Sequence, residues 1–87
     1  MQDARRKRLA MRAMRRGIKE MDLILSDYTG RKLAAMDTAG LDLFEALLDE
    51  NDHDILGWIT GQIATPPAFA PLIGDIRAGA VGLTRPV

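Results

Sequence analysis

The stretch RRGIKEMD, residues 15–22, combines residue types that could bind another molecule. Gly17 follows Arg16 directly, and Glu20 lies three residues later. A glycine costs about 1 kcal/mol relative to alanine inside a helix, so it indicates a helix end or a close approach to the backbone. An arginine offers a planar fork of donors that suits carboxylate or phosphate groups. If Gly17 joins two helices, we expect Arg16 and Glu20 to project outward beside bare backbone. The alternative is a glycine that simply ends a helix, between two solvated charges.

The other reactive side chains lack the neighbours that catalysis needs. His53, the only histidine, lies in the acidic run DENDHDI, where a helix-capping turn explains it better than a metal site. Ser26, the only serine, has no histidine near it in sequence. The acidic run lacks the glycine and glutamate positions of a calcium loop, and the chain has no phosphate-binding glycine loop. The sequence therefore predicts a protein that is not an enzyme and that binds no metal.

Length and charge limit the remaining function classes. The chain has 87 residues and no cysteine, which predicts one small domain without a disulfide framework. Residues 1–21 contain eight basic and two acidic residues, a net charge of +6, so the rest of the chain carries −6. A basic first helix could meet nucleic acid, and a small nucleic-acid-binding module is the alternative function. The acidic remainder and the lack of an aromatic stacking platform argue against it.

The pattern of apolar residues predicts an all-α fold, a compact bundle of about five short helices. The first is expected to run from a cap at Asp3 to about Arg16, with Leu9 and Met14 as its larger apolar residues. A second helix should follow Gly17 and end or bend at Thr29-Gly30 or at the residues that follow. Its expected apolar positions are Ile18, Met21, Leu23, Ile24 and Leu25.

The second half of the chain has clearer helix signals. A helix after Thr38 should place on one face Leu41, Phe44, Leu47 and Leu48. Asn51 or Asp52 can cap the next helix, which contains Trp58 and should stop at Gly61. Pro71 suits the first turn of a last helix, followed by a loose tail from about residue 79 to 87. Glycines and prolines interrupt the uncharged stretch 55–74, so we expect no membrane span.

Two blocks of the sequence resemble a known family. RGIKEMD, residues 16–22, resembles the RGxxE motif of the succinate dehydrogenase assembly factor 2 family, whose bacterial members are also called flavinylation factors. LFEALLDENDHDILGWITG, residues 43–61, is similar to the family's second signature, a leucine-rich helix followed by an acidic turn and a helix with a tryptophan. The resemblance covers roughly residues 5–77 and includes the helical character and the order of the blocks.

The resemblance implies a chaperone-like assembly factor without an active site of its own. Such a factor binds the flavoprotein subunit of succinate dehydrogenase, and in some bacteria that of fumarate reductase, and promotes covalent attachment of FAD. The FAD belongs to the partner subunit, so no cofactor is expected to be held stably by this chain. We further expect a monomer that binds no nucleic acid and does not insert directly into a membrane. Because no transit segment is recognisable, the expected location is a bacterial cytoplasm and not a mitochondrial matrix.

The resemblance also assigns candidate partner-binding residues. Gly17 is expected to allow the close backbone approach, and Arg16 and Glu20 to make the specific polar contacts. Arg15 and Asp22, on either side of the motif, are further candidates. Trp58 matches the second signature, but a tryptophan on an apolar helix face is expected to pack in the core.

Overall fold

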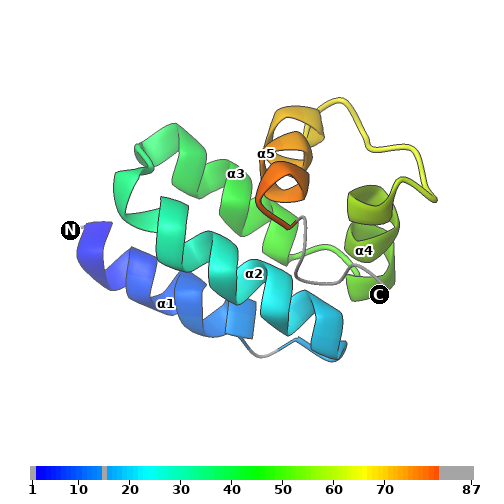
Figure 1. Cartoon of the computed structure of the whole chain (residues 1–87). Helices are drawn as coiled ribbons and strands as arrows, with labels where there is room; N and C mark the ends of the chain where they lie inside the picture. The colour runs from blue at the N-terminus through cyan, green and yellow to red at the C-terminus, as the bar shows by residue number, and fades with distance from the viewer. Residues whose placement is uncertain (1, 15, 81–87) are drawn as a thin grey trace.

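The computed structural model describes residues 2–14 and 16–80, and it confirms the all-α fold. Figure 1 shows the α-helices of this part of the chain, which are α1 (Gln2–Met14), α2 (Lys19–Lys32), α3 (Thr38–Leu48), α4 (Asp52–Thr60) and α5 (Ala70–Ala80). A short 3-10 helix, Leu33–Ala35, follows α2 directly. The expected number of about five helices is therefore confirmed.

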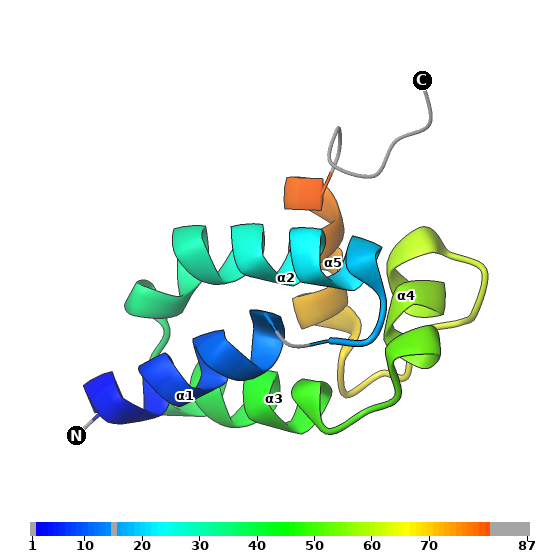
Figure 2. The same ribbon diagram turned by 90° about the horizontal axis from the view of Figure 1, so that it is seen from below.

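Helices α1, α2 and α3 form the body of the bundle. α1 packs against both α2 and α3, while α5 packs against α2 and α4. In the view from below, α1 and α3 lie side by side, and α4 stands at the end of the molecule where α1 turns into α2 (Figure 2). This arrangement brings the α1–α2 connection next to the α3–α4 connection, which the sequence separates by more than thirty residues.

One apolar core joins all the helices. Phe44 of α3 is fully buried, and its ring lies 5.9 Å from that of Tyr28 in α2. Trp58 of α4 is also buried and stacks on Phe69 with ring centroids 5.6 Å apart, so its expected core role is confirmed. Full burial of a side chain such as Phe44 contributes about 1.5–3 kcal/mol. The apolar face expected for α3 is confirmed by the burial of Leu41, Phe44, Leu47 and Leu48.

Side-chain caps set the limits of α3 and α4. Asp37 Oδ1 accepts a hydrogen bond from Gly40 N at 2.8 Å at the start of α3. Asn51 Oδ1 accepts from His53 N at 2.8 Å at the start of α4, as one of the two expected caps predicts. Gly61 ends α4 with φ at 84°, a left-handed conformation that glycine adopts without steric cost. The expected stop at Gly61 is confirmed.

Several expected details are wrong. α1 begins at Gln2, so Asp3 lies inside its first turn and does not cap it. By contrast, α2 ends at Lys32, among the residues that follow Gly30, as expected. Two apolar residues expected to face the core are instead exposed, Met14 by 56% and Leu23 by 48%.

The C-terminal segment differs partly from the expected tail. α5 begins at Ala70, with Pro71 in its first turn as expected, and continues through Ala80. Residues 79 and 80 are therefore helical, whereas residues 81–87 lie outside the described part of the chain. None of the described helices is long and apolar enough to cross a bilayer.

Candidate functional site

The corner, defined here as residues 16–20, connects α1 to α2. Ile18 precedes α2 in an extended conformation, with φ −116° and ψ 127°, and its side chain caps nothing. Backbone N–H groups at a helix start need acceptors from elsewhere when the cap side chain supplies none. Arg16 N donates to Asp22 Oδ1 at 2.9 Å, and Gly17 N donates to Asp52 Oδ2 at 2.9 Å. Two carboxylates, from α2 and α4, therefore hold the backbone of the corner.

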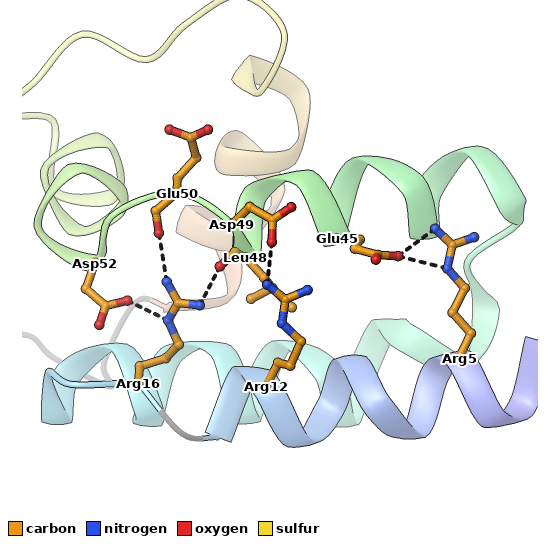
Figure 3. Close-up of polar contacts among 8 residues, drawn as sticks. All are labelled: Arg5, Arg12, Arg16, Glu45, Leu48, Asp49, Glu50 and Asp52. Carbon is orange, nitrogen blue, oxygen red and sulfur yellow. Dashed lines mark hydrogen bonds and ion pairs between the residues drawn. The ribbon is translucent and has the colours of Figure 1, made fainter.

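The Arg16 side chain points into the bundle, toward the α3–α4 turn (residues 49–52). Its Nε donates to Asp52 Oδ1 at 2.5 Å, and its two terminal nitrogens donate to the carbonyl oxygens of Leu48 at 2.7 Å and Glu50 at 3.0 Å. Figure 3 shows the guanidinium between these three acceptors. The side chain is only 10% exposed, so the expectation that Arg16 projects outward is wrong.

Gly17 is exposed, and the fold itself does not require a glycine there. Of the described residues only Gly61 has the left-handed φ that favours glycine. A Cβ placed on Gly17 would meet only Asp52 Oδ2, at 3.5 Å, an ordinary van der Waals distance. Neither backbone conformation nor internal space therefore explains why this position is a glycine.

The remaining motif residues differ in their surroundings. Glu20 is exposed in the first turn of α2 and has no hydrogen bond or ion pair with any residue of the described part. Asp22 is half-buried, and its carboxylate accepts a hydrogen bond from Arg16 N. Arg15 lies outside the described residues. The structure thus leaves Gly17 and Glu20 facing solvent, whereas Arg16 and Asp22 stabilise the corner from within.

Three arginines spaced along α1 and the corner face acidic residues of α3 and the α3–α4 turn (Figure 3). Arg5 contacts Asp42 at 2.5 Å and Glu45 at 2.9 Å, and these hydrogen bonds raise the pKa of Arg5 above its ordinary value. Arg12 contacts Asp49 at 2.5 Å. Arg16 completes the row with Asp52. Much of the positive charge of the N-terminal part is therefore neutralised inside the molecule.

An open groove of about 490 Å³ borders this row of ion pairs. It is lined by Arg8, Leu9, Met11, Arg12, Arg16 and Glu45. The lining combines arginine guanidinium groups with the apolar side chains of Leu9 and Met11.

The structure also places the two residues considered for catalysis. His53 is exposed in the first turn of α4, where its backbone N–H serves the Asn51 cap, so the capping-turn interpretation is confirmed. Ser26 lies within α2, and its carbonyl oxygen accepts from the Thr29 hydroxyl at 2.9 Å. Among the described residues, no three side chains of metal-ligating type form a cluster that could hold an ion.

Sequence reasoning considered Asp52 only as a helix cap and missed its contacts with the motif. Both of its carboxylate oxygens are engaged by Arg16 and Gly17. The sequence contains one indirect signal, because the residue before α2 is an isoleucine, which cannot cap. Several carboxylates follow α3, and only the packing of α4 against the corner selects Asp52 among them.

Comparison with known proteins identifies relatives of the chain. The sequence model of a family described as "Flavinator of succinate dehydrogenase" matches residues 7–80. Proteins named "Succinate dehydrogenase assembly factor 2, mitochondrial" are 42% identical over 65 residues in Candida glabrata and 38% identical over 65 residues in Saccharomyces cerevisiae. These matches cover 75% of the chain, but only 42% and 40% of the two relatives. The chain therefore spans less than half the length of these relatives.

These names correct one expectation and confirm another. The expected location in a bacterial cytoplasm is overturned, because the matching relatives are fungal proteins named mitochondrial. The resemblance to the family is confirmed by the match of the family model over residues 7–80. The chain therefore belongs to the family of flavinators of succinate dehydrogenase, the succinate dehydrogenase assembly factor 2 family.

Proposed function

We propose that this chain binds the flavoprotein subunit of succinate dehydrogenase and promotes covalent attachment of FAD to that subunit. The observation that carries the proposal is the match of the flavinator family to residues 7–80. The chain acts as an assembly factor and has no active site of its own. The flavoprotein, and in some cases the related subunit of fumarate reductase, holds the FAD.

The corner is the proposed docking site, and the exposed Gly17 supports this assignment. Since neither φ nor neighbouring atoms demand a glycine at this position, the requirement comes from outside the fold. A glycine lets a partner approach the backbone more closely than any side chain would allow. Gly17 therefore marks the place of closest contact with the flavoprotein.

Glu20 is the proposed polar contact beside Gly17. It lies on the first turn of α2, exposed and without a partner among the described residues. A free carboxylate can accept hydrogen bonds from an arginine or from backbone N–H groups of a partner. Leu23, one helix turn later and 48% exposed, extends this surface with an apolar side chain.

The mechanism is stabilisation of one arrangement of the flavoprotein. A factor that binds the arrangement in which the flavin and its attachment residue are close shifts the population toward it. Bond formation is accelerated because the reacting groups are held together and oriented. The chemistry of attachment stays with the flavin and its host, so this chain needs no acid, base or nucleophile.

In-gel flavin fluorescence of the denatured flavoprotein subunit tests the proposal. The subunit is produced in cells that lack the endogenous factor and are supplied with the wild-type chain, its Gly17→Arg variant or nothing. We expect fluorescence with the wild type and a loss of most of it with Gly17→Arg. The variant should remain folded, because a Cβ at this position would meet only Asp52 Oδ2, at an ordinary van der Waals distance of 3.5 Å.

Gly30→Arg is the matched control. Gly30 is exposed on α2, and a Cβ there would meet nothing within 4 Å, so the same substitution leaves the corner untouched. We expect this variant to support flavin attachment like the wild type. Absence of fluorescence with a folded wild type and its own flavoprotein would reject the function. Full fluorescence with Gly17→Arg would reject the corner as the docking site.

A further inference from the structure

We infer that Asp52 is a positioning residue of the docking corner and that Arg16 acts through it, without touching the partner. The inference rests on the proposed function and assigns new roles within it. It connects residues 16–22 with residues 43–61, because Arg16 and Gly17 of the first block bind the carboxylate of Asp52 in the second.

The Asp52 carboxylate makes two contacts with consecutive residues of the corner. Oδ1 accepts from Arg16 Nε at 2.5 Å, and Oδ2 accepts from Gly17 N at 2.9 Å. One bond holds a side chain and the other holds the backbone at the point of proposed closest contact. Because both oxygens belong to one rigid group, the side chain of Arg16 and the peptide of Gly17 are fixed relative to α4.

Arg16 has little left to offer a partner. Each of its three guanidinium nitrogens donates a hydrogen bond, to Asp52, to Leu48 O and to Glu50 O. These acceptors close the end of α3 and the start of α4 around the side chain. A partner could reach the guanidinium only after breaking contacts that place the corner. Arg16 therefore holds the site in place from within, whereas Gly17 and Glu20 form the surface that meets the partner.

Asp49 provides a matched control, since it is an aspartate in the same turn that also binds an arginine. Its Oδ1 contacts Arg12 at 2.5 Å. Both partners of this pair are more exposed than Arg16 and Asp52, and neither contacts the corner. Asp49→Asn removes the same charge as Asp52→Asn without changing the contacts of Arg16 or Gly17.

A double-mutant cycle tests the inference. The affinity for the purified flavoprotein subunit is measured for the wild type, Asp52→Asn, Arg16→Gln and the double variant. Residues that work in one network are strongly non-additive. We expect Asp52→Asn and Arg16→Gln each to weaken binding by about tenfold. The double variant should bind less than about twofold more weakly than either single variant. The Asp49→Asn and Arg12→Gln pair is expected to change binding by less than about twofold.

Failure of the proposed function and failure of the inference give different results. If the wild type does not bind the flavoprotein, the proposed function fails and the role of Asp52 fails with it. If the wild type binds and the losses at Arg16 and Asp52 multiply, Arg16 contacts the partner independently and only the inference is overturned. Equal losses for Asp52→Asn and Asp49→Asn would overturn it as well, because general charge would then be the cause.

Two further measurements guard against simple unfolding of Asp52→Asn. Asp52→Glu keeps a carboxylate within reach of Arg16, and we expect it to recover part of the lost affinity. Amide hydrogen exchange on the wild-type chain needs no substitution. Gly17 is exposed, yet its N–H should exchange more slowly than an exposed amide without an acceptor, because Asp52 holds it. An unprotected Gly17 amide would overturn the inference whatever the variants do.

Discussion

Arg16 shows how a single charged residue can stabilise a turn from inside. Its planar guanidinium reaches three oxygens that lie in different directions, a carboxylate and two carbonyls. The Leu48 carbonyl belongs to the last residue of α3, where a helix leaves backbone oxygens without helical partners, and the Glu50 carbonyl belongs to the turn that follows. A lysine carries the same charge, but its ammonium group lacks the fork geometry needed to meet all three acceptors.

At this scale we predict that Arg16→Lys lowers the free energy of unfolding by roughly 1–3 kcal/mol, because hydrogen bonds to charged groups are lost in a largely buried setting. Arg12→Lys is the control. Arg12 is 39% exposed and contacts only Asp49, so we expect a loss of about 1 kcal/mol or less. Urea denaturation of both variants and the wild type measures the difference. Equal losses of unfolding free energy would show that the contacts of Arg16 contribute no more to stability than those of Arg12.

The contact between α2 and α5 shows how two elements are joined by a few specific groups. Tyr28 of α2 donates its hydroxyl to Asp75 Oδ2 of α5 at 2.8 Å. Further along the same contact, the Arg31 guanidinium lies so close to Gly79 that a Cβ there could not fit without its displacement. Gly79 thus lies in α5 as a point of close approach between helices. The sequence analysis had assigned it to a loose tail, since it could not place Arg31 opposite.

The tyrosine at this contact predicts a dependence of stability on alkaline pH. Burial, reinforced by the hydrogen bond to Asp75, raises the pKa of Tyr28 well above its ordinary value. Because the folded state holds the neutral form more tightly, this stabilisation is complete below pH 10. It is lost as the pH rises further, where an unfolded tyrosine ionises. Stability should therefore fall above this pH.

Tyr28→Phe tests this link between the elements. Phenylalanine keeps the ring against Phe44 and cannot ionise, so we expect a smaller loss of stability above pH 10 than in the wild type. At neutral pH the lost hydrogen bond should cost about 0.5–1.5 kcal/mol. Thermal melts of both proteins between neutral and alkaline pH measure the effect. Parallel pH profiles would show that Tyr28 does not cause the alkaline loss.

At the scale of the whole molecule, opposite charges of the two parts of the chain meet across one contact. The N-terminal 21 residues carry +6 and the rest carries −6. Arg5, Arg12 and Arg16 form ion pairs with acidic residues of α3 and the α3–α4 turn. Arg6 adds hydrogen bonds to the carbonyl oxygens of Leu33 and Met36. Several cations that a nucleic-acid-binding helix would need are therefore already engaged within the protein.

We accordingly predict no measurable affinity for duplex DNA at about 0.15 M salt. Phosphate binding by a basic helix requires free cations, and Arg5, Arg6 and Arg12 of α1 are already engaged within the protein. Fluorescence anisotropy of a labelled duplex, repeated at lower salt, measures this directly. Tight binding that weakens steeply with salt would restore the alternative of a nucleic-acid module. The flavoprotein serves as the positive control for an active preparation.

The sequence by itself determined the helical fold, the caps at Asn51 and Gly61 and the face of α3. These features depend on neighbouring residues and on the helical period, both of which can be read along the chain. It also contained the two blocks that identify the family. The sequence also located the corner, but it did not determine which way the Arg16 side chain points. The direction of a long side chain depends on acceptors that are far away in sequence.

Only the tertiary structure decided which residues of the corner face outward. Arg16 turns inward because α4 places Asp52 within its reach, and because the end of α3 and the following turn each place one carbonyl oxygen there. Met14 and Leu23 stay exposed because no element within residues 2–14 and 16–80 covers their sides of α1 and α2. Periodicity identifies which residues share a helix face, but the packing of distant helices decides which face is buried and which charges are paired.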